Sequence, residues 1–230
     1  MPRDVEFCVA PDDEQAAAIV AGELTMAVER GGQIAVSGGS SPRPAYEQAA
    51  ALAPNWNRSR VELWFADERC VPPEDSRSNY RLVRETLLDR LRQPPLVHRV
   101  RGELPPEEAA EAYDTDASGL RLDLVLLGIG PDGHTASLFP GSPALDERER
   151  AAVAAEAGLE PFVPRVTLTV PILSAAALVL FLVVGGDKAE AVARAFAGQP
   201  DPATPASLVR SEEGRTVAVL DQPAASLLRK

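Results

Sequence analysis

The chain has 230 residues, enough for one sizeable hydrophobic core or for two closely joined lobes. Hydrophobic residues make up 45% of it and charged residues 25%, which is ordinary for a water-soluble globular protein. The formal net charge of −11 argues against nucleic acid or an anionic membrane as a general partner, because both are polyanions.

The cysteine count and the apolar runs indicate the compartment. Cys8 and Cys70 are the only cysteines, and their spacing fits neither a metal site nor a disulfide framework, which favours a reducing environment. The N-terminal stretch 1–15 lacks the apolar core of a signal peptide. The longest apolar run, 175–184, is too short to span a bilayer. We therefore expect a cytoplasmic protein.

Short apolar runs typical of strands alternate with helical patterns along the chain. In chain order we predict a strand at 5–9, a helix at 12–32, a strand at 33–39, a helix at 40–52, a strand at 61–67, helices at 78–91 and 107–118, strands at 122–127, 165–170 and 177–184, a helix at 187–198 and a strand at 215–221. The helix at 40–52 has serine as a candidate N-cap and proline in its first turn. The charged stretch 142–158 has a helical pattern, and the proline-rich stretch 198–207 is expected to be a surface loop.

This alternation predicts an α/β fold. Continuous apolar strands indicate burial on both faces, and strand–helix alternation produces a mainly parallel sheet. We expect a three-layer, Rossmann-like architecture with right-handed crossovers and helices on both faces of the sheet. No repeat and no clear interdomain linker is present, so residues 1–230 are expected to form a single domain.

Gly128, Gly130 and Gly133 match the dinucleotide-binding pattern G-x-G-x-x-G, which is a weak signal without its structural context. A dinucleotide site needs a long helix opening at the third glycine and a second strand ending in an acidic residue. Neither is apparent here, because a Pro-Gly pair soon follows and the next stretch is charged and helical. These glycines instead indicate a tight turn that presents Asp132 and His134 at the end of a strand.

Two other glycine motifs also follow predicted strands, where ligands of parallel sheets bind. Backbone N–H groups and hydroxyls of the stretch 38–41 (Gly38, Gly39, Ser40 and Ser41) suit a phosphomonoester, although a plain strand-to-helix turn has the same composition. Lys188 lies in the first turn of a predicted helix, where a cation is unfavourable unless an anion lies nearby. Lys188 would therefore lie beside a bound anion such as phosphate, or alternatively it is an ordinary lysine exposed to solvent.

A charged triplet, Asp67, Glu68 and Arg69, follows the strand at 61–67. It can form an exposed corner or a polar site with an anion-binding arginine. The neighbouring Cys70 could be imagined as a nucleophile, but nothing in the local sequence obviously lowers its pKa.

His134 is the candidate base. An imidazole accepts a proton at neutral pH, and Asp132 can orient it and stabilise the imidazolium. No further histidine or cysteine cluster completes a zinc site, so a metal-free base is the simpler interpretation. The other histidine, His98, is expected to be structural.

Five stretches together resemble the 6-phosphogluconolactonase family, which shares its fold with glucosamine-6-phosphate deaminase. They are "SGGSSP", "FADERCVPPEDSRSNY", "DLVLLGIGPDGHTASLFPG", "RVTLTVPIL" and "GGDKAEAV", in family order over roughly residues 33–195. One departure is Ser41, where the family usually has threonine, and the hydroxyl is kept.

The resemblance implies hydrolysis of 6-phospho-D-glucono-1,5-lactone to 6-phosphogluconate, the second step of the oxidative pentose phosphate pathway, without a metal or organic cofactor. It implies that His134 is the general base and that Asp132 orients it. The expected substrate-binding residues are Gly38, Gly39, Ser40, Ser41, Asp67, Glu68, Arg69, Gly130, Arg165 and Lys188. The sequence does not identify the donors to the carbonyl oxyanion, and backbone N–H groups near 130–133 are one suggestion. The expected partner is a sugar-phosphate lactone, not nucleic acid or membrane, bound by a monomer or small homo-oligomer.

Two other functions remain open. Deaminase or isomerase chemistry of the sister family uses a glutamate just before the proline, where this chain has Phe139. The triplet 67–69 also differs from the sister motif. A non-catalytic sugar-phosphate sensor would keep the phosphate loops and could dispense with His134. Such a sensor is expected to carry an additional DNA-binding segment, and this chain has no basic module of that kind.

Overall fold

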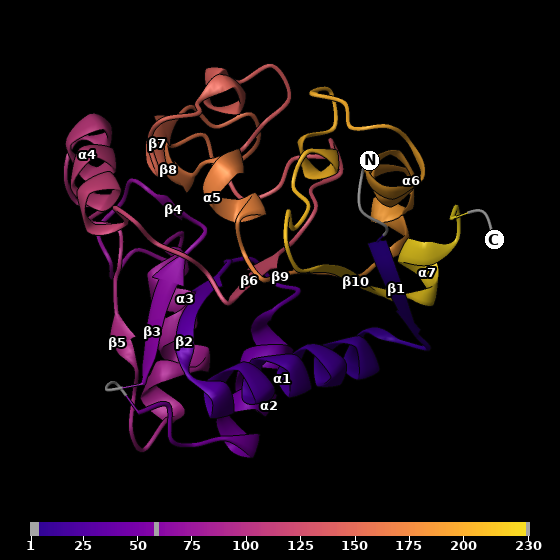
Figure 1. Cartoon of the computed structure of the whole chain (residues 1–230), viewed down its shortest axis with the longest axis horizontal. Helices are drawn as coiled ribbons and strands as arrows, with labels where there is room; N and C mark the ends of the chain where they lie inside the picture. Colours follow the sequence, from indigo (N-terminus) through magenta and orange to yellow (C-terminus); the bar gives the residue numbers. More distant parts are fainter. Residues whose placement is uncertain (1–4, 58–59, 229–230) are drawn as a thin grey trace.

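The computed structural model describes residues 5–57 and 60–228, so the ends of the expected domain, 1–4 and 229–230, lie outside the described residues. Its centre is a seven-stranded sheet in which every neighbouring pair is parallel, which confirms the α/β prediction (Figure 1). In sheet order the strands are β1 (Val5–Ala10), β10 (Arg215–Asp221), β9 (Leu178–Val183), β6 (Leu124–Leu127), β2 (Gly32–Val36), β3 (Val61–Phe65) and β5 (Leu96–Val97).

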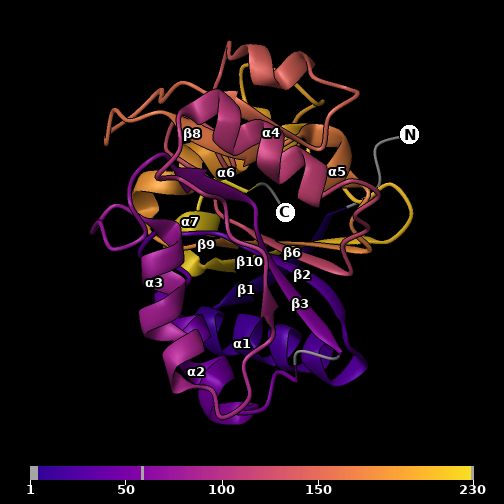
Figure 2. The ribbon, with the colours of Figure 1, turned by 90° about the vertical axis from the view of Figure 1, so that its left-hand side faces the viewer.

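Three helices cover one face of this sheet: α1 (Asp13–Arg30), α2 (Arg43–Leu52) and α3 (Asn79–Thr86) (Figures 1 and 2). Their apolar side chains pack with those of the central strands. Leu24 of α1, Tyr46 of α2 and Val83 of α3 are fully buried in one cluster with Ile34 and Leu126. Burial on this scale explains why the central strands are continuously apolar.

The opposite face is covered by α4 (Pro106–Asp116), α5 (Val170–Ser174), α6 (Ala189–Ala197) and α7 (Gln222–Ala225), together with a small antiparallel sheet (Figure 2). The small sheet has the order β4 (Asp67–Arg69), β8 (Arg165–Leu168) and β7 (Ala152–Ala155). The result is the expected three-layer architecture, with a second sheet that the sequence did not predict. The strand expected at 165–170 belongs to this second sheet.

The helix expected at 142–158 is wrong. The stretch forms a short 3₁₀ turn at Pro143–Asp146 and then β7, which pairs with β8. The carboxylate of Asp114 on α4 accepts hydrogen bonds from the backbone N–H groups of Ala151 (2.6 Å) and Ala152 (3.3 Å). Ala152 is fully buried. A contact made 37 residues away therefore overrides the helical preference of an alanine-rich segment.

Three smaller expectations also need correction. Neither Ser40 nor Ser41 caps α2, because the helix begins after Pro42 and has no side-chain cap. The helix expected at 78–91 ends at Thr86 and is followed by a 3₁₀ turn at Leu88–Arg90. The expected surface loop 198–207 is exposed only in its first part, because residues 204–207 are buried and the N–H of Ala206 donates to the carbonyl of Gly133 (2.9 Å).

The order of the central strands explains where the motifs meet. β9, β6, β2 and β3 are neighbours in the sheet and run in the same direction. Each is followed by one of the polar motifs identified in the sequence, so these motifs converge at one edge. None of the helices within residues 5–57 and 60–228 is long and apolar enough to cross a membrane.

Candidate active site

A cleft of about 330 Å³ opens at this edge of the sheet, bounded by the loops after β2, β6 and β9 and by the small sheet. The structure brings nearly all of the sequence-predicted site residues together around it. Those that line the cleft are Gly38, Gly39, Ser40, Ser41, Asp67, Arg69, Gly130, His134, Arg165 and Lys188. Asp132 lies behind His134, and Glu68 lies elsewhere.

The imidazole of His134 is held by Asp132. Nδ1 of the ring lies 2.6 Å from Oδ1 of Asp132, and the same oxygen accepts the backbone N–H of His134 (3.1 Å). Burial raises the pKa of Asp132, but the hydrogen bond and the charge of His134 outweigh burial, so the pKa lies below its ordinary value. In the described part of the chain Nε2 makes no hydrogen bond, and this nitrogen is available to the cleft.

Two neighbours fix the plane of the ring. A Cβ atom at Gly130 would lie 2.1 Å from both Cε1 and Nδ1 of His134, so only glycine leaves room for the imidazole there. On another side the ring of Phe139 packs against it, with centroids 4.6 Å apart and planes tilted by 39°. Gly130 therefore contributes to the cleft through the room that it leaves for the imidazole of His134.

The glycine turn uses its own N–H groups. The N–H of Gly130 donates to the carbonyl of His134 (2.9 Å), and the N–H of Gly133 donates to the carbonyl of Gly130 (2.9 Å). Pro131 has no N–H. The suggestion that N–H groups near 130–133 stabilise an oxyanion is therefore wrong for both of these glycines, because their donors are already engaged.

Arg69 of β4 and Arg165 of β8 form the cationic wall of the cleft. They are directly opposite each other in the β4–β8 pairing. Burial lowers the pKa of Arg165, and so does the positive charge of Arg69, whereas the negative charge of Asp67 is the largest effect in the opposite direction. Neither arginine makes an ion pair within the described residues. Two like charges facing each other are unfavourable, so the pair is suited to share an anion.

Each of these guanidinium groups is oriented by backbone carbonyls. Arg165 donates from Nε to Val163 (3.0 Å) and from Nη2 to Pro161 (2.9 Å). Arg69 donates from Nη1 to the carbonyl of Arg77 (2.6 Å), and its Nε is buried without a partner. Other guanidinium N–H groups remain for a ligand.

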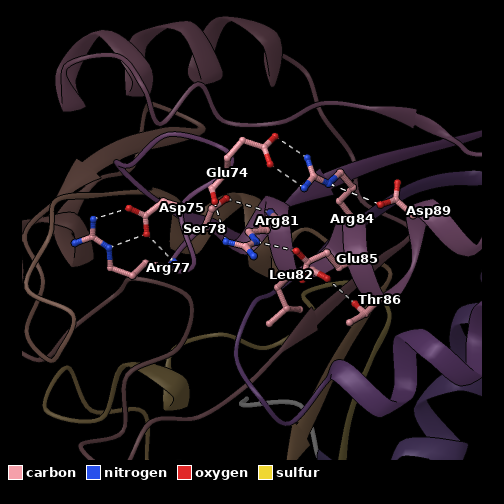
Figure 3. Close-up of polar contacts among 10 residues, drawn as sticks. All are labelled: Glu74, Asp75, Arg77, Ser78, Arg81, Leu82, Arg84, Glu85, Thr86 and Asp89. Atoms are coloured by element: carbon pink, nitrogen blue, oxygen red, sulfur yellow. Dashed lines mark hydrogen bonds and ion pairs between the residues drawn. The ribbon is translucent and has the colours of Figure 1, made fainter.

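The segment that holds Arg69 is itself braced against α3 (Figure 3). Glu74 accepts two hydrogen bonds from Arg84 (2.7 and 2.9 Å), and its carbonyl accepts one from Arg81 (2.8 Å). Asp75 binds the guanidinium of Arg77 in the same two-pronged way (2.9 and 2.7 Å). Exposed ion pairs add little stability, but these contacts lie in the same segment as Arg77, whose carbonyl accepts a hydrogen bond from Arg69.

The loops after β2 and β9 form the remaining wall. Gly39 has a φ of +98°, a conformation that favours glycine, and together with Ser40 it is exposed at the cleft. Lys188 follows β9, and its Nζ lies 3.3 Å from the largely exposed carboxylate of Asp187. This loosely held ammonium supplies a third positive charge to the cleft.

Glu68 does not line the cleft, and the expectation that it binds substrate has no support in its position. Its carboxylate accepts the backbone N–H groups of Arg69, Asn79 and Tyr80, each at 2.7 Å, and the hydroxyl of Ser78 at 3.1 Å. Burial raises its pKa, whereas these backbone donors act in the opposite direction. Glu68 therefore accepts hydrogen bonds from backbone N–H groups at the N-terminus of α3, which have no partner within the helix.

Sequence reasoning missed Asn79, which lines the cleft and donates to Asp67. It lies in the quoted motif "FADERCVPPEDSRSNY", and its position at the start of a helix beside that motif was the available signal. Burial and the nearby carboxylates outweigh the charge of Arg165 and raise the pKa of Cys70 to about 11, so its thiol is not activated. Among the residues that the structure covers, no three His, Cys, Asp or Glu side chains gather to hold a metal ion.

A comparison with protein families decides the assignment. The model of glucosamine-6-phosphate isomerases/6-phosphogluconolactonase matches residues 12–218. The chain belongs to this glucosamine-6-phosphate isomerase/6-phosphogluconolactonase family. Within it, the chain is 42% identical to a 6-phosphogluconolactonase of Homo sapiens over 209 residues, which is 85% of this chain and 80% of the human protein. It is 35% identical to a 6-phosphogluconolactonase of Synechocystis over 229 residues, which covers 94% and 93% of the two chains.

Solved structures agree with this family assignment. The 6-phosphogluconolactonase of Trypanosoma brucei superposes with a TM-score of 0.88 at 28% identity, covering 100% of both chains. A monomeric glucosamine-6-phosphate deaminase superposes with a TM-score of 0.85 at 20% identity, covering 98% of this chain and 100% of its own. The deaminase shares the fold, which confirms the expected glucosamine-6-phosphate deaminase-like architecture.

Proposed function

We propose that the chain hydrolyses 6-phospho-D-glucono-1,5-lactone to 6-phosphogluconate, a step of the oxidative pentose phosphate pathway, with His134 as the general base. Relatives with 35–42% identity over most of the chain carry the name of this activity. The observation that carries the proposal is the pairing, within one cleft, of a carboxylate-held imidazole and a cationic wall. A phosphorylated lactone needs a base at its ring ester and cations at its phosphate.

The reaction needs no covalent intermediate, because a lactone is an activated ester. Nε2 of His134 takes a proton from water as the water oxygen bonds to the lactone carbonyl carbon, and Asp132 stabilises the imidazolium that forms. The tetrahedral intermediate then breaks the bond between this carbon and the ring oxygen. The leaving ring oxygen takes the proton back from His134, and the acid product ionises. General-base assistance is worth about 10²–10⁴-fold in rate.

The phosphate supplies binding energy remote from the reacting carbon. Arg69 and Arg165 provide two positive charges on the wall formed by the small sheet, and Lys188 adds a third from the loop after β9. Ser40 and Ser41 provide hydroxyl donors. Charge-assisted hydrogen bonds to phosphate are about twice as strong as neutral ones. Fixing the phosphate end positions the ester carbon against the water that His134 activates.

The alternative chemistry of the sister family has less support. Phe139 occupies the position where the sister motif has glutamate, and its ring packs on the imidazole at 4.6 Å. No carboxylate is available at that position to assist ring opening of an amino sugar. Release of ammonia from glucosamine 6-phosphate would nevertheless support the deaminase.

We further propose that a single chain, folded as one domain, is sufficient for activity. The family model extends over residues 12–218, and the residues that line the cleft fall within this range. Both cysteines are free thiols, which supports a cytoplasmic location.

The test uses freshly generated lactone, with the spontaneous hydrolysis rate subtracted. We expect wild-type protein to accelerate ring opening, and His134→Ala to lose most of this acceleration while still binding 6-phosphogluconate. The matched control is His98→Ala, since His98 is the only other histidine and is paired with Glu62 at 2.6 Å outside the cleft. An His134→Ala protein with wild-type activity would overturn the assignment of the base, and binding without any hydrolysis by the wild type would indicate a sensor.

A further inference from the structure

The carboxylate of Asp67 is held at the cleft by two buried side chains from other segments. Nδ2 of Asn79, the first residue of α3, donates to its Oδ1 (3.1 Å), and the hydroxyl of Ser137, in the loop after β6, donates to its Oδ2 (2.6 Å). Asp67 is 6% exposed, Asn79 1% and Ser137 0%. Each carboxylate oxygen is therefore fixed by one donor within the protein.

Of the three buried carboxylates in the described part of the chain, Asp67, Glu68 and Asp221, only Asp67 lines the cleft. Within residues 5–57 and 60–228 it makes no ion pair, although Arg165 lies close enough to feel its charge. A carboxylate has about four lone-pair sites, and the side chains of Asn79 and Ser137 use only two of them. The remaining lone pairs are suited to accept hydrogen bonds from a ligand in the cleft.

The side chain of Asn79 donates hydrogen bonds to Asp67, while its own amide oxygen is left without a donor. Its amide nitrogen donates both to the carbonyl of Asp67 (2.8 Å) and to Oδ1 of Asp67, while its Oδ1 is buried without a partner. That oxygen lies against Gly38, only 1.8 Å from where a Cβ would be. A buried acceptor without a donor is unfavourable, so the orientation of Asn79 is better explained by its effect on Asp67 than by stability.

We propose that Ser137 and Asn79 are positioning residues, which hold the Asp67 carboxyl group in the cleft so that its oxygens accept hydrogen bonds from ring hydroxyls of the substrate. This inference rests on the proposed function. The cations of the cleft bind the phosphate end of the substrate, and Asp67 supplies the acceptor that a polyhydroxylated ring requires. The three residues together therefore select a sugar ring rather than any phosphate ester.

A double-mutant cycle tests this proposal. Ser137→Ala, Asp67→Asn and the double variant are compared for kcat and KM with fresh lactone and for the Kd of 6-phosphogluconate. Competition by inorganic phosphate, which has no ring, reports on the cationic wall alone. We expect Ser137→Ala to raise KM and Kd by about tenfold, the usual worth of a hydrogen bond to a charged group, with kcat within about twofold and phosphate inhibition unchanged. In a protein that already carries Asp67→Asn, Ser137→Ala should raise KM and Kd further by less than about twofold.

The matched control is Ser211→Ala, which removes a hydroxyl that is also buried (1% exposed) and also donates at 2.6 Å, but to the carbonyl of Ala176. It should leave KM and Kd unchanged. Asn79→Ala provides an independent second cycle with Asp67→Asn should Ser137→Ala fail to fold. Unchanged KM in both variants, a loss in kcat instead, or effects that add fully in the Asp67→Asn background would each overturn the inference. Absence of lactone hydrolysis by the wild type would instead overturn the proposed function.

Discussion

Nδ1 of His134 lies 2.6 Å from Oδ1 of Asp132, and this contact leaves Nε2 as the ring nitrogen to which the proposed mechanism assigns the role of base. A carboxylate accepts a hydrogen bond at this position, so the neutral ring that the proposed mechanism needs would have its proton on Nδ1 and its lone pair on Nε2. Gly130 leaves the space in which the ring lies, and Phe139 packs against the ring. The imidazole of His134 is thus held in place by its own loop.

Replacing Asp132 should separate this orienting effect from substrate binding. In Asp132→Asn the amide can place its own N–H against Nδ1, which favours the wrong tautomer and no longer stabilises the imidazolium. We expect kcat to fall by about 10²–10⁴-fold, the range of general-base catalysis, with KM within about threefold. Steady-state kinetics on fresh lactone would measure both constants. The control is Asp116→Asn on the surface, and an Asp132→Asn enzyme that keeps half of its kcat would contradict the assignment.

The room at Gly130 gives a second prediction. Gly130→Ala introduces a Cβ 2.1 Å from two atoms of the imidazole, so the ring must move away from Asp132. We expect kcat to fall at least about tenfold, because small displacements of a catalytic group are costly. Gly22→Ala on α1 is the matched control, since its Cβ would meet nothing within 4 Å. Thermal melts would verify folding, and full activity of Gly130→Ala would show that the ring position is not critical.

The sequence predicted the central sheet and the convergence of the motifs well, for physical reasons. β2, β6 and β9 are largely apolar and are followed within two residues by a glycine, and both features are local. The segment 142–158 was predicted wrongly because alanine and charged residues favour a helix, and its strand depends on Asp114 far along the chain.

Within the site, the sequence identified the residue types but not all of the directions in which side chains point. Asp67, Glu68 and Arg69 are consecutive, yet only Asp67 and Arg69 line the cleft. Glu68 alternates to the other side of β4 and meets the start of α3 at Asn79. Assigning these roles required knowing where α3 begins in space.

The position of Glu68 predicts a loss of stability rather than of binding. Glu68→Gln places an NH₂ group against backbone N–H donors and leaves some of them unpaired, which costs about 1–3 kcal/mol in the free energy of unfolding. The melting temperature should fall by roughly 2–4 °C per kcal/mol, while KM for the lactone changes less than about threefold. Glu111→Gln, at an exposed position of α4, serves as the control. A larger change in KM without loss of stability would support the original prediction that Glu68 binds substrate.

Cys70 should be unreactive near neutral pH. Because its pKa is raised to about 11, its thiolate fraction at pH 8 is about one thousandth, and alkylation should accelerate about tenfold per pH unit up to about pH 11. Iodoacetamide labelling of a Cys8→Ala protein, followed by intact mass, reports on Cys70 alone. Cys70→Ala should keep wild-type kcat. Rapid labelling at pH 7.5, or an inactive Cys70→Ala enzyme that remains folded, would point to a nucleophilic role.

The facing pair of Arg69 and Arg165 predicts that an anion stabilises the fold. Inorganic phosphate should raise the melting temperature of the wild type, because a ligand that binds only the folded state shifts the unfolding equilibrium. Arg69→Met and Arg165→Met should each weaken phosphate binding by at least about tenfold, since one charge-assisted hydrogen bond is worth about 1.5–3 kcal/mol. In these two variants, most of the phosphate-induced rise in melting temperature should then disappear. Arg101→Met, which removes a surface arginine 3.9 Å from Asp116, should retain it. Thermal melts across a phosphate series would decide, and an equal increment in all of these proteins would mean that the two arginines do not bind the anion.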